Sequence, residues 1–382
     1  MAPFRRVAQF GAVLTVLGAA LGPVPTGAAS ESRRTHPERT VAMTAQDQED
    51  SRVLAGRRIV LSYPGPTPPP EVLRTIREGR AAGVILFGEN VISPEQLAAA
   101  VGELTHAAAE APNPRALLLM TDQEGGKVRR LPGAPELSAR RTGSAANPRA
   151  AAVDSGVGAA RTLADAGLNV NLAPVLDVYD TPDNFIDHSE RSYSQDPSTV
   201  GQLGSAFLAA QQSLGVAATA KHFPGLGAAA RDGNTDERPV TLDIPLERIR
   251  AREEAPYRAA IAAGVRLVMA SWAVYPALDP DRPAGFSPAV IQGELRGRLG
   301  FDGVTVTDAM EAGALDPYGD TGDRAIAAAE AGMDLMLCSG RDPRQAEDAA
   351  EALAAALDSG RLDRQAFTAA VSRVDALRAS LD

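Results

Sequence analysis

The chain has 382 residues, of which 48 are acidic and 38 are basic, so its formal net charge is −10. This acidic balance argues against a nucleic acid as the partner. Cys338 is the only cysteine, which excludes an intramolecular disulfide, and the four histidines show no metal-binding spacing such as HExxH. We therefore expect no cofactor and no metal ion; a metal site built only of carboxylates is the alternative left open.

The first residues have the layout of a secretory signal peptide. Arg5 and Arg6 precede an apolar stretch at 7–21, which prolines and small residues follow. The stretch is too short to anchor the chain in a membrane. We expect a signal peptide at 1–29, a flexible tether at 30–51 and a secreted protein with no integral membrane segment after cleavage, exported by either the general or the twin-arginine route.

Eight short apolar runs then alternate with segments of helical periodicity. The expected strands are 58–63, 83–87, 116–121, 169–176, 217–221, 267–271, 303–307 and 333–338. The expected helices are 70–82, 94–109, 148–166, 197–214, 247–263, 287–299 and 323–331, with two more within 344–380. Eight βα units predict an α/β fold, a (β/α)8 TIM-type barrel that forms a single domain over 52–382. The competing doubly wound sheet requires a glycine-rich turn after its first strand, and the segment 62–68 is rich in proline instead.

Ionisable residues follow several of the expected strands. Asp122 follows the third, Asp177 the fourth, Lys221 and His222 the fifth, and Asp308 the seventh. Because the carboxyl ends of barrel strands meet at one rim, these side chains are expected to share an active site.

Lys221 is conspicuous because the chain contains only two lysines, Lys127 and Lys221. A buried ammonium group is costly unless it is paired, so Lys221 at the end of a buried strand indicates a functional site. Its alternatives are a structural lysine at a strand end or a lysine that forms a Schiff base. We interpret Lys127 as a solvated residue.

Carboxylates and cations without a phosphate-binding loop are typical of enzymes that hydrolyse neutral, polyhydroxylated substrates. Glycoside hydrolysis needs one carboxylate that faces the anomeric carbon and one acid that protonates the leaving oxygen. Asp308 is the candidate nucleophile because it directly follows a strand; its alternative role is a helix N-cap.

Six segments in the same order carry a resemblance to a known family: DQEGGKVRR at 122–130, NLAPVLDV at 171–178, ERSYSQDP at 190–197, KHFPGLG at 221–227, FSP at 286–288 with LRGRLGFDG at 295–303, and TDAM at 307–310. Over about residues 55–340 the chain resembles family 3 glycoside hydrolases, specifically single-domain bacterial β-N-acetylhexosaminidases of the cell-wall recycling type. The resemblance implies that Asp308 is the nucleophile that forms a glycosyl-enzyme intermediate. It also implies a sugar-binding role for Asp122, Arg130, Arg191, Lys221 and His222. We interpret Glu124, which precedes two glycines, as structural.

The sequence departs from the family at the proton donor. These enzymes carry Asp-x-His after the KHFPG motif, whereas this chain has Asp236 at the aspartate position and Arg238 at the histidine position. Arginine stays protonated and cannot act as a general acid. We take Asp236 as the acid, with Glu237, Asp232 and His188 as alternatives.

The expected function is that of a secreted retaining β-glycosidase, an exo-acting β-N-acetylhexosaminidase that releases terminal N-acetylglucosamine from cell-wall or chitin-type glycans. The alternatives are another β-glycosidase of the family and a sugar-binding pseudoenzyme that has lost the acid. A carbohydrate is the expected partner. The sequence does not decide the natural glycan or the oligomeric state.

Overall fold

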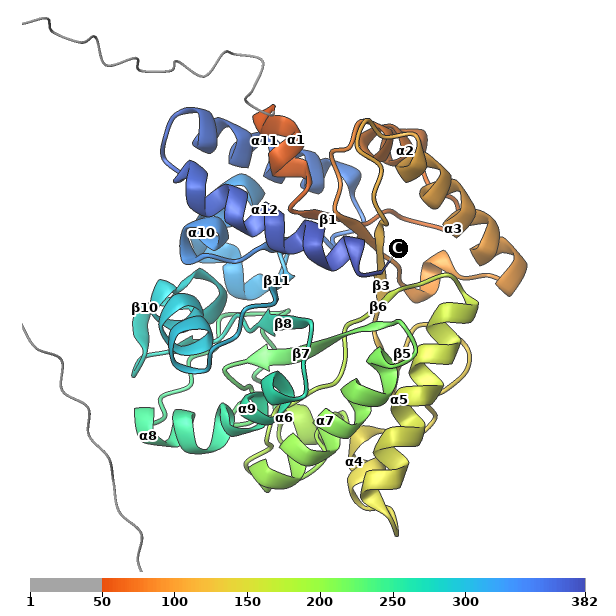
Figure 1. Ribbon diagram of the computed structural model, residues 1–382. Coiled ribbons are helices and arrows are strands. Elements are labelled where there is room, and N and C mark those ends of the chain that lie inside the picture. Colours follow the sequence, from red (N-terminus) through yellow and green to blue (C-terminus); the bar gives the residue numbers. More distant parts are fainter. Residues whose placement is uncertain (1–49, 382) are drawn as a thin grey trace, which may run out of the picture. The chain divides into compact units, whose positions relative to one another are not determined.

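The computed structural model describes residues 50–381, and its centre is a closed barrel of eight parallel strands (Figure 1). The strands follow one another around the barrel in the order β1, β12, β11, β8, β7, β6, β3 and β2. Their bounds are β1 Ile59–Leu61, β2 Gly83–Ile85, β3 Leu118–Thr121, β6 Val170–Asn171, β7 Ala217–Phe223, β8 Leu267–Ala270, β11 Val304–Ala309 and β12 Leu335–Leu337. Each lies within or overlaps one of the eight expected runs, so the predicted (β/α)8 barrel is confirmed. The predicted signal peptide, and nearly all of the predicted tether, lie outside the described residues.

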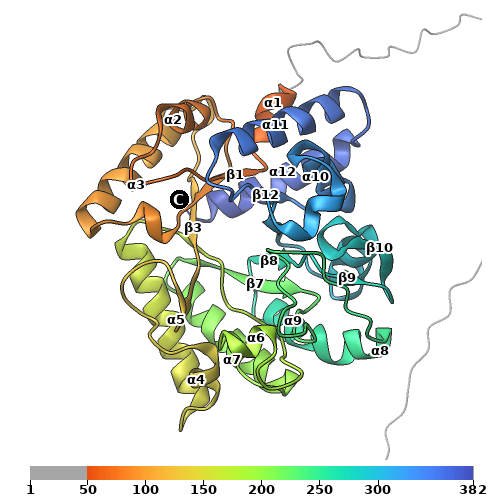
Figure 2. The same ribbon diagram turned by 180° about the vertical axis from the view of Figure 1, so that it is seen from behind.

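Helices surround the barrel on all sides (Figures 1 and 2). The longer ones are α2 Pro70–Arg77, α3 Pro94–Ala109, α5 Pro148–Asp165, α7 Pro197–Gln212, α9 Ala255–Ala262, α10 Thr321–Ala331, α11 Pro343–Asp358 and α12 Arg364–Ala379. Short elements complete the fold: α1 Ser51–Gly56, α4 Ala139–Gly143, α6 Phe185–His188, α8 Leu246–Arg248, and the hairpins formed by β4 Gln123–Gly125 with β5 Val128–Arg129 and by β9 Val274–Tyr275 with β10 Asp279–Pro283. Within the described part of the chain, no helix is long and apolar enough to span a membrane.

Proline and a capping side chain set the beginnings of the helices as the sequence suggests. Ser93 Oγ accepts a hydrogen bond from the Gln96 amide at 3.2 Å just before α3, and Asp196 Oδ2 accepts one from the Thr199 amide at 2.8 Å just before α7. Two expected helices differ from a regular α-helix. The region 247–263 contains a π-helical segment, η2 Ile249–Glu253, between α8 and α9, and η4 Ala289–Arg298 is π-helical as well.

The C-terminal helix α12 closes one end of the barrel. Val374 and Leu377 of α12 belong to the same buried cluster as the side chains that fill the barrel interior. Those interior side chains include Val60, Leu118, Val170, Ala217, Leu267, Val304 and Leu335. Arg373 of α12 donates to Asp334 Oδ1 just before β12, and Arg378 of α12 donates to Ala116 O shortly before β3, so α12 covers the amino ends of the strands. The carboxyl ends of the strands are left as the place for a site.

Candidate active site

A cavity of about 380 Å³ lies at the carboxyl ends of the barrel strands, a size within the range of about 300–1,000 Å³ typical of small-molecule sites. Its apolar lining includes Ile85, Leu172, Met269 and Leu337, which lie at or near the carboxyl ends of four of the barrel strands. All seven residues predicted as catalytic or substrate-binding line this one cavity: Asp122, Arg130, Arg191, Lys221, His222, Asp236 and Asp308. The tertiary structure therefore brings together side chains that are up to 186 positions apart (308 − 122) in the sequence.

Lys221 joins two carboxylates in the wall of the cavity. Its Nζ atom lies 2.7 Å from Asp122 Oδ1 and 2.7 Å from Glu124 Oε1, and its side chain is only 3% exposed. Burial by itself would lower the pKa of Lys221, but the two carboxylates outweigh it and the net shift is upward. Lys221 is thus held as an ammonium. A Schiff base requires the neutral amine, so this pairing argues against the Schiff-base alternative.

Glu124 is a central member of the network, although the sequence suggested only a structural role. Arg191 donates to it in a bidentate pair, from Nε to Oε2 at 2.9 Å and from Nη2 to Oε1 at 2.8 Å. Burial would raise the pKa of Glu124, but Arg191 and Lys221 together hold it well below its usual range. The β4–β5 hairpin turns Glu124 into the cavity wall, beside Arg130, whose Nη2 lies 3.5 Å from Asp122 Oδ2.

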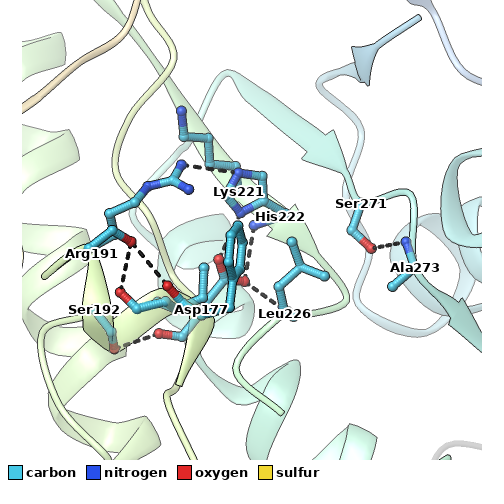
Figure 3. A network of polar contacts seen from close by, with 12 residues as sticks. Asp177, Arg191, Ser192, Lys221, His222, Leu226, Ser271 and Ala273 are labelled. Atoms are coloured by element: carbon cyan, nitrogen blue, oxygen red, sulfur yellow. Dashed lines mark hydrogen bonds and ion pairs between the residues drawn. The ribbon is translucent and has the colours of Figure 1, made fainter. Parts of the chain in front are cut away.

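Asp177, which follows the fourth barrel strand β6, contacts the imidazole ring of His222 (Figure 3). Asp177 Oδ2 lies 2.7 Å from His222 Nδ1, and Asp177 Oδ1 accepts from the Leu226 amide at 2.7 Å. Because the buried carboxylate can only accept, we assign the proton to Nδ1 of His222. The other ring nitrogen, Nε2, lies 3.3 Å from Arg191 Nη2 and accepts from it. With both ring nitrogens engaged, His222 is held in place between Asp177 and Arg191.

Asp308 is half-buried at the carboxyl end of β11 and lines the cavity. Its Oδ1 accepts from the Ala309 amide at 2.8 Å. The next helical segment begins only at Gly313, and Ala312 precedes it. Asp308 is therefore not a helix N-cap, which leaves its carboxylate available to the cavity.

Of the four candidate proton donors, all within the described residues, Asp236 alone lines the cavity. His188 lies outside, between Asp183 Oδ1 at 3.0 Å and Arg231 Nη2 at 3.2 Å. Asp232 and Glu237 also lie outside the lining; the first pairs with Arg238 and the second accepts from Asn234.

The environment of Asp236 suits a group that carries a proton. Desolvation in the cavity, together with the charge of Asp308, raises the pKa of Asp236 to about 6. The loop that carries Asp236 is bound to the segment after β11: Gly313 N donates to Asp236 O at 2.8 Å, and Ala314 N donates to Thr235 O at 3.0 Å. The loop that carries Asp236 is thereby hydrogen-bonded to the segment that follows Asp308.

Sequence reasoning missed several residues of the cavity wall, namely Phe87, Glu311, Ser339 and Arg341. They follow β2, β11 and β12, and the position of Glu311 three residues after Asp308 was the signal available. Lys127 is exposed, and its Nζ donates to His188 O at 3.2 Å, consistent with a solvated residue. In the part of the chain that the structure describes, no cluster of three His, Cys, Asp or Glu residues is arranged to hold a metal ion.

The sequence matches the glycosyl hydrolase family 3 N terminal domain over residues 61–377. The chain belongs to glycosyl hydrolase family 3. An uncharacterized secreted glycosyl hydrolase from Arthroderma benhamiae is 45% identical over 332 residues, which cover 87% of this chain and 94% of that protein. The family 3 membership makes the chain a glycoside hydrolase and confirms the resemblance seen in its motifs.

Two solved structures share the fold. A family 3 β-N-acetylglucosaminidase from Paenibacillus sp. str. FPU-7 superposes with a TM-score of 0.81 at 35% identity, covering 87% of this chain and 62% of that one. A β-N-acetylhexosaminidase from Beutenbergia cavernae superposes with a TM-score of 0.78 at 34% identity, covering 87% of this chain and 99% of that one. The family 3 chain described here thus spans about three fifths of the first protein and nearly all of the second.

Proposed function

We propose that this family 3 hydrolase is a secreted, retaining β-N-acetylhexosaminidase that removes terminal N-acetylglucosamine from cell-wall or chitin-type glycans. The observation that carries the proposal is the pairing, in one cavity, of the half-buried carboxylate Asp308 with a second carboxyl group, Asp236, whose pKa is raised to about 6. A carboxyl group with a raised pKa beside a second carboxyl group in one cavity fits the acid and nucleophile pair that retaining glycosidases use. The Paenibacillus and Beutenbergia relatives support the acetamido sugar.

The reaction proceeds in two displacements. Asp308 attacks the anomeric carbon while the glycosidic C–O bond breaks, and Asp236 gives its proton to the leaving oxygen. Asp236, now a carboxylate, then takes a proton from water, whose oxygen attacks the anomeric carbon and breaks its bond to Asp308. Each cycle consumes one water and returns both carboxyl groups to their starting states.

The charged network holds the sugar during both steps. Asp122 and Glu124 accept hydrogen bonds, whereas Arg130, Arg191 and Lys221 donate them, so the wall matches the mixed donor and acceptor character of sugar hydroxyls. Because these side chains are fixed by one another, little conformational entropy is lost when the sugar binds.

We also propose that the chain is organised as a signal peptide at 1–29, a tether at 30–51 and one catalytic domain at 52–382. The charge and hydrophobicity pattern of the first residues supports export, and the Arthroderma benhamiae relative is named a secreted hydrolase.

Hydrolysis of nitrophenyl β-glycosides of N-acetylglucosamine, N-acetylgalactosamine and glucose by the purified protein tests the proposal. We expect the N-acetylglucosamine derivative to be the best substrate and Asp308→Asn to lose at least about a thousandfold in kcat, or roughly 4 kcal/mol of barrier. Asp302→Asn, which makes the same charge change at the other end of β11, is the control and is expected to keep wild-type rates.

Three outcomes contradict parts of the proposal. An Asp308→Asn enzyme with more than a tenth of the wild-type rate would remove Asp308 from the mechanism. A preference for the glucoside would favour another β-glycosidase activity. Tight binding of N-acetylglucosamine without any turnover would favour the pseudoenzyme alternative.

A further inference from the structure

One wall of the cavity takes no part in the charged network that holds the sugar. It is formed by Phe87 after β2, Glu311 after β11, and Ser339 and Arg341 after β12. We call these four residues the β12-side wall. The network residues instead follow β3, lie within β7 or lie in the loop after β6, and these three strands are neighbours in the barrel.

The proposed proton donor indicates what lies against this wall. Asp236 is bound through its main chain to Gly313, two residues beyond Glu311 on the same segment. A general acid must reach the glycosidic oxygen, so that oxygen is positioned near the Asp236 side chain. With the sugar held on the β3–β7 side and Asp308 between, the leaving group extends toward the β12-side wall. This step rests on the proposed function.

Glu311 is held firmly in place although it is exposed to the cavity. Ser339 Oγ donates to Oε1 at 2.6 Å, Ser339 N donates to Oε2 at 3.2 Å, and Gln345 Nε2 donates to Oε2 at 3.1 Å. These three donors fix the position of both carboxyl oxygens of Glu311. A carboxylate has about four acceptor positions, so one is left for a ligand.

Arg341 is the one cation of the β12-side wall, and it already has partners. Its guanidinium carbon lies 4.1 Å from the centre of the Phe87 ring, and its Nε atom lies 3.2 Å from Glu89 Oε1. The backbone at Arg341 has φ = 59°, a left-handed conformation that is uncommon for a residue other than glycine and is often found at functional sites. The two acidic residues Glu89 and Glu311 and the single cation Arg341 together give this side of the cavity one net negative charge.

We propose that the β12-side wall is the leaving-group subsite, that it accepts a neutral or amine-bearing sugar in preference to one carrying a carboxylate, and that Glu311 sets this preference. A sugar ring packs against the Phe87–Arg341 pair, and one of its hydroxyl or ammonium groups donates to Glu311. A carboxylate at the same place is repelled by the charge of Glu311, and Arg341 is already paired with Glu89 and does not offset this repulsion. The subsite therefore favours chitin-type over muramyl-type glycans.

Three β-1,4-linked disaccharides test the inference, each with non-reducing N-acetylglucosamine. Their reducing sugars are N-acetylglucosamine, glucosamine and N-acetylmuramic acid, whose lactyl group carries the carboxylate. We expect kcat/KM of the wild type for the first two to exceed that for the third by roughly tenfold or more, since like charges at a recognition site disfavour the wrong ligand. Hydrolysis of the nitrophenyl N-acetylglucosaminide is measured alongside as the test of the proposed function itself.

Two substitutions move the preference in a defined direction. Glu311→Gln removes the repelling charge, and Glu89→Gln releases Arg341, so each is expected to shift the ratio of kcat/KM several-fold toward the muramyl substrate. Glu247→Gln, an equal charge change on exposed α8 away from the cavity, is expected to leave the ratio unchanged. Because each ratio is taken within one enzyme preparation, a smaller folded fraction cancels.

The inference is overturned if the wild type cleaves the muramyl disaccharide as fast as the neutral one, or if neither glutamate substitution moves the ratio. An enzyme that cleaves the nitrophenyl glycoside but shows no preference refutes the subsite alone. If the nitrophenyl glycoside is not cleaved, the proposed function fails. The affinities of the three disaccharides for the wild type are then measured by calorimetry. Weaker binding of the muramyl disaccharide than of the other two supports the subsite, and equal binding refutes it.

Discussion

Replacing Asp236 by asparagine removes the proton that the leaving oxygen needs while keeping the shape of the side chain. Asp236 has a pKa of about 6 because it is desolvated in the cavity and repelled by Asp308. With that pKa, about nine tenths of the enzyme carries the acid proton at pH 5 and about one tenth at pH 7. Since the protonated form is the active one for glycosylation, kcat/KM of the wild type for a disaccharide should fall about tenfold per unit above pH 6.

The assay compares two leaving groups. A dinitrophenolate departs without protonation, whereas a sugar hydroxyl does not, and general acid catalysis contributes typically about 10²–10⁴ in rate. Asp236→Asn should therefore lose about 10²–10⁴ in kcat/KM for the N-acetylglucosamine disaccharide but less than about tenfold in the glycosylation of a dinitrophenyl N-acetylglucosaminide. Added azide should accelerate the second reaction of this variant, because azide attacks the intermediate without a general base.

Glu237→Gln is the matched control, since it makes the same charge change on the neighbouring residue outside the cavity lining, and it should retain activity on both substrates. Equal losses on the disaccharide and the dinitrophenyl glycoside in Asp236→Asn, without rescue by azide, would refute the acid role. A wild-type pH profile without a limb near pH 6 would contradict the assignment of the raised pKa.

Three further predictions concern the surroundings of the site. Lys221→Met leaves two cavity carboxylates without their shared cation, and breaking such a buried pair should lower the free energy of unfolding by about 3–5 kcal/mol in urea titrations; a loss below 1 kcal/mol would contradict this. Gly313→Ala places a Cβ atom 2.3 Å from Glu237 O, so it should displace the acid loop and slow disaccharide cleavage far more than dinitrophenyl glycoside cleavage. Burial raises the pKa of Glu253 to about 8, so its contribution to stability is present below about pH 4.5 and is lost toward pH 8, at up to about 1.4 kcal/mol per unit; Glu253→Gln should flatten that part of the profile of melting temperature against pH, and an unaltered slope would refute the assignment.

The sequence by itself determined the barrel and most of its catalytic rim. Strands that are buried on both faces have a short, apolar signature, and the direction of a parallel strand dictates which of its ends carries the site. These side chains lie within the last three residues of such a strand or directly beyond it, so their convergence was predictable from local pattern alone: Asp122, Lys221, His222 and Asp308. The buried strand residues and the helix N-caps, such as Ser93 and Asp196, were likewise predictable from local sequence pattern.

Only the tertiary structure decided which acid enters the cavity and what the remaining wall contains. Asp232, Asp236 and Glu237 lie within six residues of each other in an irregular loop, where side-chain direction has no period. The path of that loop is set by its main-chain hydrogen bonds to Gly313 and Ala314, which are more than 75 positions away in the sequence (313 − 236 = 77). The inward turn of Glu124 likewise depends on the β4–β5 hairpin and on pairing with Arg191 from a distant loop. Strand periodicity is a local property, whereas the direction of a loop side chain depends on contacts between segments that only folding brings together.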